Sequence, residues 1–160
     1  DPAGPRCRSS VAASNVARMV LRGLKALRLR MRAHGGSALR VAQWLEARPN
    51  RERVINPDLP RHPQHVLAKR QLQGFGGIVT IRIKGGLEAS RRMLEQTRLF
   101  ALAESLGGVE SLIEHPAIMT HASVPAEKRA ELGIDDGLIR LSVGVEDVED
   151  LIAELDACLR

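Results

Sequence analysis

Residues 100–147 read FALAESLGGVESLIEHPAIMTHASVPAEKRAELGIDDGLIRLSVGVED. Their last apolar run, residues 138–143, places alternate residues on opposite faces with a period of two, which predicts a strand. Arg140 lies inside this run, and an arginine among apolar neighbours is rarely buried without an anionic partner. Its planar fork matches a carboxylate or a phosphate with two parallel hydrogen bonds. Two roles are therefore possible for Arg140. It either binds an anionic ligand or forms a structural ion pair with one of three nearby acids, Glu131, Asp135 or Asp136.

A small polar turn lies upstream of this strand. Glu104 and Ser105 come just before the pair Gly107-Gly108. Such a pair more often reflects backbone geometry than ligand contact, so a plain turn or helix end is one interpretation. Together with Arg140, however, the turn suggests a carboxylate-binding site.

The rest of the chain predicts an α/β fold. Strands are expected at residues 53–55, 77–84, 99–102 and 138–143, and helices at residues 65–72, 87–96, 124–133 and 147–159. The few strands, interleaved helices and short connections predict a small, mainly antiparallel sheet covered by helices on one side.

The N-terminal third is less regular. Residues 1 to about 14 offer little apolar surface and are expected to be unstructured. Helical periodicity follows between Met19 and Leu45, interrupted by His34-Gly35-Gly36, where the glycines cost about 2 kcal/mol of helix propensity relative to alanines. One kinked helix and two separate helices are both compatible with this pattern.

Positive charge is concentrated in residues 1–53, which hold 12 of the 24 Lys and Arg but only 3 of the 19 Asp and Glu. Such a segment could follow nucleic-acid phosphates. It lacks the interleaved aromatic residues that stack on bases, so a solvated or subunit-facing helix is favoured and no nucleic-acid partner is expected.

Several other classes of site are not expected. His62 and His65 flank a proline without a third ligand nearby, which favours a surface loop over a metal site. No stretch approaches the roughly 20 apolar residues of a membrane span, so no membrane partner is expected. Cys7 and Cys158 are far apart in the sequence, which favours a reducing, cytoplasmic setting.

The stretch at residues 100–147 resembles the C-terminal domain of the cystathionine gamma-synthase and gamma-lyase family, the pyridoxal-phosphate enzymes of cysteine and methionine metabolism. The resemblance covers about residues 19–160 and leaves residues 1–18 as a divergent, disordered lead-in. Upstream, it rests on motifs in the family's order, at residues 22–25, 29–31, 57–65, 68–71 and 74–77.

The resemblance implies a fold and a site. The fold is that of the C-terminal domain of fold-type I pyridoxal-phosphate enzymes. Arg140 would grip the substrate α-carboxylate, Glu104 and Ser105 would line the same pocket, and Thr120 would border it. The implied substrate is an amino acid such as cystathionine or an O-acyl homoserine in transsulfuration, and the complete enzyme would be a homo-oligomer.

The chain also departs from the family. Its cofactor lysine, in an S-x-T-K type context, has no counterpart among Lys25, Lys69, Lys84 and Lys128, and the chain contains no tyrosine to stack on the cofactor. We therefore expect no catalytic, cofactor-binding or metal-binding residue in this chain, and pyridoxal 5'-phosphate belongs to the complete enzyme. The alternative is a catalytically inactive remnant or interaction subunit that retains the fold.

Overall fold

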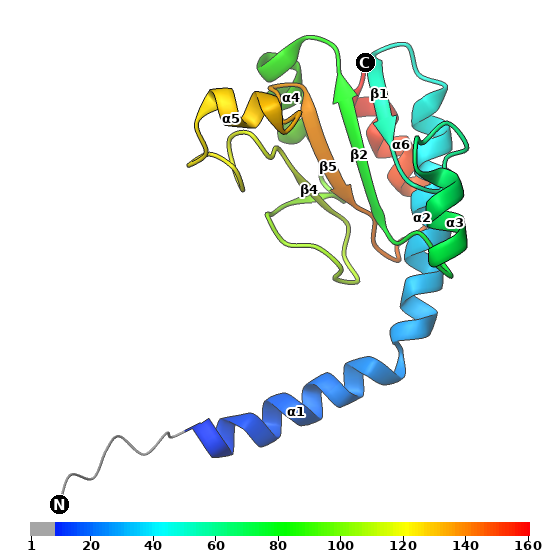
Figure 1. Ribbon diagram of the computed structural model, residues 1–160, viewed down its shortest axis with the longest axis vertical. Coiled ribbons are helices and arrows are strands. Elements are labelled where there is room, and N and C mark those ends of the chain that lie inside the picture. The colour runs from blue at the N-terminus through cyan, green and yellow to red at the C-terminus, as the bar shows by residue number, and fades with distance from the viewer. Residues whose placement is uncertain (1–8) are drawn as a thin grey trace, which may run out of the picture.

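A five-stranded sheet organises the chain in the computed structural model, which describes residues 9–160, with side chains from residue 14 onward (Figure 1). Every neighbouring pair of strands is antiparallel except the parallel pair at one edge, β3 and β4. The order across the sheet is β1 (Arg51–Ile55), β2 (Ile78–Ile83), β5 (Leu138–Ser142), β4 (Leu112–Glu114) and β3 (Ala101–Leu102). The expected small, mainly antiparallel sheet is confirmed, whereas β4 was not anticipated.

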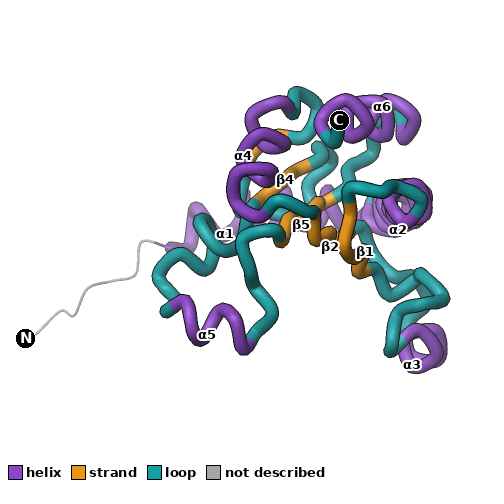
Figure 2. Tube along the Cα trace, turned by 90° about the horizontal axis from the view of Figure 1, so that it is seen from above, coloured by secondary structure: helices purple, strands orange, loops and turns teal. Residues whose placement is uncertain are grey.

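Three helices cover one face of this sheet, as Figure 2 shows from above: α2 (Leu27–Glu46), α4 (Gly86–Gln96) and α6 (Val148–Cys158). Their apolar side chains form one core with the sheet, including Leu45, Met93 and Leu155. The other helices lie outside this layer: α1 (Ser9–Lys25), α3 (His65–Gln71) and α5 (Ala126–Glu131). The structure thus confirms the expected layer of helices on one side.

The alternation of side chains along the central strands explains this arrangement. Val79 and Ile81 of β2, with Ile139 and Leu141 of β5, are buried in the core under the helices. Because successive residues of a strand point to opposite faces, Arg140 lies on the other face, which has no such helix layer. The fold therefore presents Arg140 on the uncovered face of the sheet.

The N-terminal helices differ from the expectation in two respects. Residues 9–14, expected to be unstructured, begin α1, because extending a helix that has already nucleated adds one hydrogen bond for each residue fixed. Residues 1–8 lie outside the described residues. The break falls at Ala26, whereas Gly35-Gly36 lies inside α2. Burial of His34 and of core residues further along α2 outweighs the low helix propensity of the two glycines.

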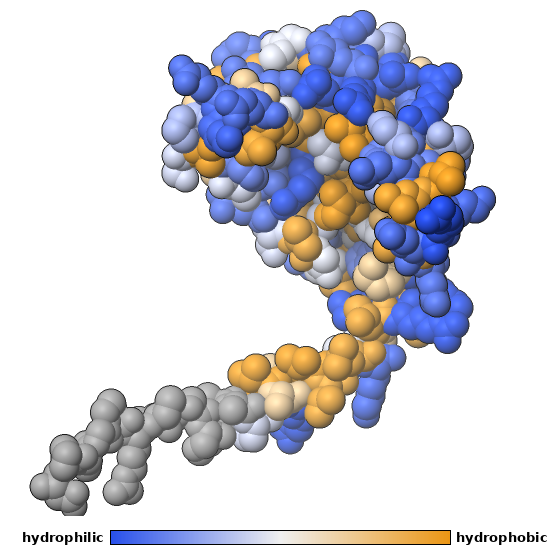
Figure 3. All heavy atoms as spheres, viewed as in Figure 1, coloured by the Kyte–Doolittle hydropathy of each residue, from blue (hydrophilic) through white to orange (hydrophobic). Residues whose placement is uncertain are grey.

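Helix α1 extends away from the sheet and exposes apolar side chains along its length (Figure 3). Met19, Val20, Leu21 and Leu24 are each 52–76% exposed. We call these four residues the α1 apolar face. Among the helices of residues 9–160, none is long and apolar enough to span a membrane.

Candidate carboxylate-binding site

Arg140 occupies the middle of β5, between a neighbouring strand on each side. In the register of the sheet it lies opposite Thr80 of β2 and opposite Glu114 of β4. Its side chain is 21% exposed, so the guanidinium is sheltered but still reaches the surface. The strand pairing therefore places one cation beside one acid on the uncovered face.

The guanidinium makes three contacts that define the site. Nη2 donates to the backbone carbonyl oxygens of Glu104 at 2.9 Å and of Ser105 at 3.1 Å. Nη1 lies 2.9 Å from Oε1 of Glu114, which is an ion pair by distance, although its N–H is not aligned as a hydrogen bond. The structure thus brings Arg140, Glu104 and Ser105 together as the sequence analysis grouped them, but through backbone oxygens, while the side chains of Glu104 and Ser105 are exposed.

The structural ion pair considered in the sequence analysis is wrong in its choice of acid. Glu131 pairs with Lys128 of its own helix, at 2.6 Å. Asp135 pairs with Arg82 at 2.7 Å. The acid that meets Arg140 is Glu114, because the pairing of β4 with β5 sets them opposite each other.

The turn that supplies the two carbonyls is attached to the end of β5. The backbone N–H of Gly107 donates to the Ser142 hydroxyl at 3.1 Å, and Val145 N–H donates to the Val109 carbonyl at 2.9 Å. Gly107 has φ +75°, a conformation that favours glycine. Any side chain at Gly144 would come within 2.4 Å of the Val109 carbonyl oxygen. The Gly-Gly pair therefore belongs to a turn whose geometry holds residues 104 and 105 against Arg140.

Glu114 is the most deeply buried group of the site, with a side chain only 1% exposed. Burial raises the pKa of its carboxyl group, while Arg140 and, to a smaller extent, Thr120 and His121 act to lower it; Glu104 adds to the rise. The Thr120 hydroxyl also lies 2.9 Å from Nδ1 of His121. Thr120 thus acts on the same carboxyl group as Arg140, although no aligned hydrogen bond joins it to Glu114.

The sequence analysis did not identify Glu114 as a site residue, although the sequence contains a pattern that points to it. Like Arg140, it is a single charge next to apolar residues, in Leu112-Ile113-Glu114. Two lone charges of opposite sign in two short apolar runs indicate a cross-strand pair. The three-residue length of β4 concealed that strand.

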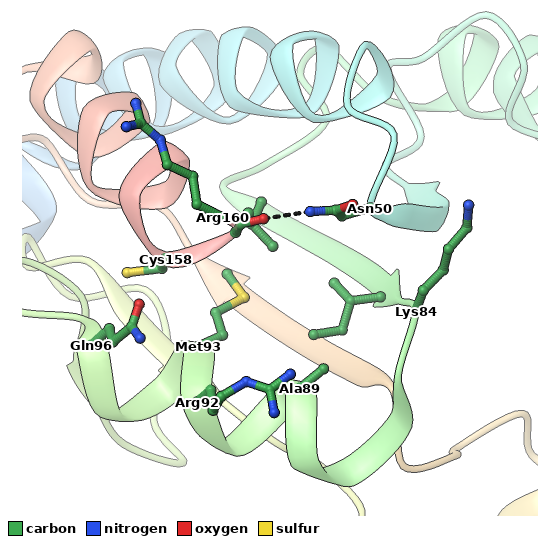
Figure 4. Close-up of a pocket in the computed structure, with 10 residues that line it drawn as sticks. Asn50, Lys84, Ala89, Arg92, Met93, Gln96, Cys158 and Arg160 are labelled. Atoms are coloured by element: carbon green, nitrogen blue, oxygen red, sulfur yellow. Dashed lines mark hydrogen bonds between the residues drawn. The ribbon is translucent and has the colours of Figure 1, made fainter.

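A pocket at another end of the sheet does not form a second anion site. It is lined by Lys84, Arg92 and Arg160, with Met93 and Cys158 nearby. Figure 4 shows that the Lys84 and Arg160 side chains point away from the cavity, so the three cations do not converge. Burial raises the pKa of the Cys158 thiol, which disfavours the reactive thiolate.

The residues present do not fit a pyridoxal-phosphate site. A lysine that binds this cofactor is activated by desolvation or by a neighbouring cation. All the lysines of the chain are exposed, and Lys128 is engaged with Glu131: Lys25, Lys69, Lys84 and Lys128. Among the described residues, no lysine is therefore desolvated in the way that this cofactor's lysine requires.

The helix-covered, mainly antiparallel sheet and the sheltered Arg140 define an α/β domain with a candidate carboxylate site. The chain belongs to the family described as Cys/Met metabolism PLP-dependent enzyme, which it matches over residues 8–160. Members of this family depend on pyridoxal phosphate, so this is the cofactor of the complete enzyme. The match includes residues 8–18, which the sequence analysis set apart as divergent.

The relatives are enzymes that act on sulfur-containing amino acids, to judge from their names. The chain is 59% identical over 141 residues to cystathionine gamma-lyase of Dictyostelium discoideum and 57% identical over 141 residues to cystathionine beta-lyase of Coxiella burnetii. Each alignment covers 88% of this chain but 36% of the relative. The chain thus spans just over a third of the length of these relatives.

Solved structures agree with the fold. Cystathionine gamma synthase from Xanthomonas oryzae pv. oryzae, in complex with cystathionine, has a TM-score of 0.84 and 50% sequence identity to this chain. The superposition covers 87% of this chain and 36% of that one. A second structure of the same enzyme, in complex with aminoacrylate and cysteine, gives the same values. The fold is therefore that of a part of a fold-type I pyridoxal-phosphate enzyme.

Proposed function

We propose that this chain is the C-terminal, substrate-carboxylate-binding part of a pyridoxal-phosphate enzyme of sulfur amino-acid metabolism, similar to cystathionine gamma-synthase and gamma-lyase. Residues 19–160 form the domain. The observation that supports this function best is the sheltered guanidinium of Arg140, held by the carbonyls of Glu104 and Ser105 on the uncovered face of the sheet. The names of the relatives support the choice of enzyme class.

Arg140 would bind the α-carboxylate of an amino acid such as cystathionine or an O-acyl homoserine. The carbonyls of Glu104 and Ser105 hold Nη2, and among the described residues Nε has no partner. Nε–H shares one edge of the guanidinium with Nη2, so a carboxylate would accept from Nε and displace one of the two carbonyls from Nη2 to gain a bidentate grip. Binding at this point fixes the orientation of the α-carbon.

The cofactor supplies the electron sink for such reactions when it is bound. This chain contributes orientation and charge, and Thr120 borders the site from the far side of Glu114. The cofactor lysine must come from another part of the enzyme, because the exposed lysines here do not fit that role. In the complete enzyme we expect a homo-oligomer, in which the α1 apolar face is covered.

Replacing Arg140 by lysine in the full-length enzyme tests the proposal. The charge remains but the planar guanidinium is lost, so kcat/KM for the amino-acid substrate should fall. The fall should correspond to a loss of about 2 kcal/mol or more of transition-state stabilisation. The free energy of unfolding should change less. Unchanged kcat/KM together with a lower unfolding midpoint would assign Arg140 a structural role.

An inactive remnant or interaction subunit is the second candidate. The absence of a fitting lysine and the exposure of the α1 apolar face favour it. The coding sequence immediately upstream separates the two. An open frame that encodes an S-x-T-K segment supports the enzyme part, whereas a stop codon or frameshift there supports the remnant.

A further inference from the structure

A buried acid beside a ligand-binding arginine calls for an explanation that substrate binding alone does not give. Glu114 is almost inaccessible, and its Oε1 lies 2.9 Å from Nη1 of Arg140. Substrate carboxylates carry the same charge as an ionised Glu114. If the arginine served only to attract a carboxylate, a neighbouring acid would weaken that attraction.

Stability is not a sufficient reason for the pair. Taking two charges out of water costs free energy that their attraction often fails to recover, so a buried ion pair is weak evidence for stability. The same sheet contains a more exposed ion pair, in which Arg82 meets Asp135 with a 47% exposed side chain. That pair connects β2 to the start of β5 without burying an acid.

The geometry around Arg140 points to orientation instead. An arginine side chain has many rotamers, and ordering it on binding costs affinity. Here Nη2 is fixed by two backbone carbonyls, and Nη1 lies 2.9 Å from the acid directly across the strand pair. Among the nitrogens of the guanidinium, only Nε has no described partner.

We propose that Glu114 is a positioning residue, whose carboxyl group holds the guanidinium of Arg140 in the orientation that receives the substrate α-carboxylate. This inference rests on the proposed function of Arg140. Glu114 does not touch the substrate; it acts through the arginine. Its position opposite Arg140 in the β4–β5 register makes this contact, unlike those of the turn at residues 104 and 105, a property of the sheet.

Thr120 and His121 extend this arrangement on the far side of Glu114. The Thr120 hydroxyl acts on the Glu114 carboxyl group and also lies 2.9 Å from Nδ1 of His121. A hydroxyl has one proton to donate. If Thr120 donates it to Glu114, His121 must carry a proton on Nδ1 and donate to Thr120. Neither oxygen of the Glu114 carboxyl group has an aligned hydrogen bond in this structure, so a Thr120–Glu114 bond would form only after a small shift of one side chain.

The test measures how strongly the full-length enzyme, loaded with its cofactor, prefers a carboxylate. Norleucine and norleucinamide serve as competitive inhibitors, and the ratio of their inhibition constants reports recognition of the carboxylate. Glu114→Gln should reduce this ratio by about tenfold or more, as loss of a charge-assisted contact implies, and should raise KM more than it lowers kcat. Adding Glu114→Gln to Arg140→Lys should lower the ratio no further, because both act on one contact.

Each outcome has a distinct meaning. If Arg140→Lys keeps the wild-type ratio, the proposed function itself fails. If Arg140→Lys lowers the ratio of inhibition constants but a folded Glu114→Gln variant keeps the wild-type ratio, the positioning role of Glu114 is overturned. Asp135→Asn, which breaks the other ion pair of the sheet, is the control and should leave the ratio unchanged. Should Glu114→Gln fail to fold, Thr120→Val and Glu114→Asp replace it; a wild-type ratio in both overturns the proposal.

Discussion

At the scale of single residues, the ionisation of Glu114 gives the structure a measurable dependence on pH. Burial raises the pKa of this carboxyl group from its ordinary 4.5, although Arg140, Thr120 and His121 oppose the rise. The folded chain therefore keeps a proton that the unfolded chain releases. It follows that the free energy of unfolding falls as pH rises through the window from about 4.5 up to the raised value.

Glu114→Gln should remove this component. The stability of the wild type relative to the variant should be greatest at acid pH and should decline as pH rises through that window. Urea unfolding of both proteins at a series of pH values measures the difference, with Glu95→Gln as a control, because the Glu95 side chain is exposed and does not act on Glu114. A difference that does not vary with pH contradicts the assignment.

The two charges of the site differ in how far the sequence could predict them. Arg140 could be identified because it lies within a six-residue alternating run, which a period of two makes recognisable. Glu114 lies on a three-residue strand, and its partner is in a strand that follows much later in the chain. Such nonlocal pairing leaves no local periodicity, so only the structure showed which acid meets the arginine.

At the scale of elements, two glycines of the N-terminal half have opposite roles. Gly36 is exposed inside α2, and a methyl group there would meet nothing within 4 Å. Gly77, just before β2, has no such space: a Cβ would lie 3.0 Å from Cβ of His34 and 3.1 Å from the Val143 carbonyl oxygen. The close approach of α2 to the sheet thus depends on Gly77.

Gly36→Ala should stabilise the chain by about 0.5–1 kcal/mol, since alanine is the better helix former and loses less backbone entropy on folding. Gly77→Ala should destabilise it by about 1–3 kcal/mol, the usual cost of overpacking. The two variants add the same methyl group and so control for each other. Urea unfolding compares them, and equal effects of the same sign would refute this account of α2.

The helix boundaries show why local propensity could not place the break between α1 and α2. The glycine pair costs helix propensity, which made it the expected interruption. Yet α2 continues through it, because Ala38, Val41 and Leu45 are fully buried within the next three turns. Tertiary burial is not visible in a propensity scale, so the sequence located the helical region but misplaced its break.

At the scale of the whole molecule, a chain whose lysines are all exposed should not retain the cofactor. Incubated with pyridoxal phosphate and then dialysed, the isolated chain should show no stoichiometric visible absorption band, because every lysine is exposed and none is desolvated. It should not turn over cystathionine. The full-length enzyme treated in the same way is the positive control. A persistent band together with turnover would contradict the proposed division of roles.

The α1 apolar face leads to the last prediction. Soluble monomers rarely expose large contiguous apolar patches, and this helix presents Met19, Val20, Leu21 and Leu24 to solvent while extending away from the sheet. The isolated chain should therefore self-associate and bind an apolar fluorescent dye. Val20→Glu with Leu24→Glu should weaken both effects, measured by sedimentation and by dye fluorescence. Leu132→Glu, at an exposed apolar residue just after α5, is the matched control and should change neither. A monomeric wild-type chain without dye binding would show that the α1 apolar face needs no cover, and the expected burial of this face in a complete enzyme would lose its physical basis.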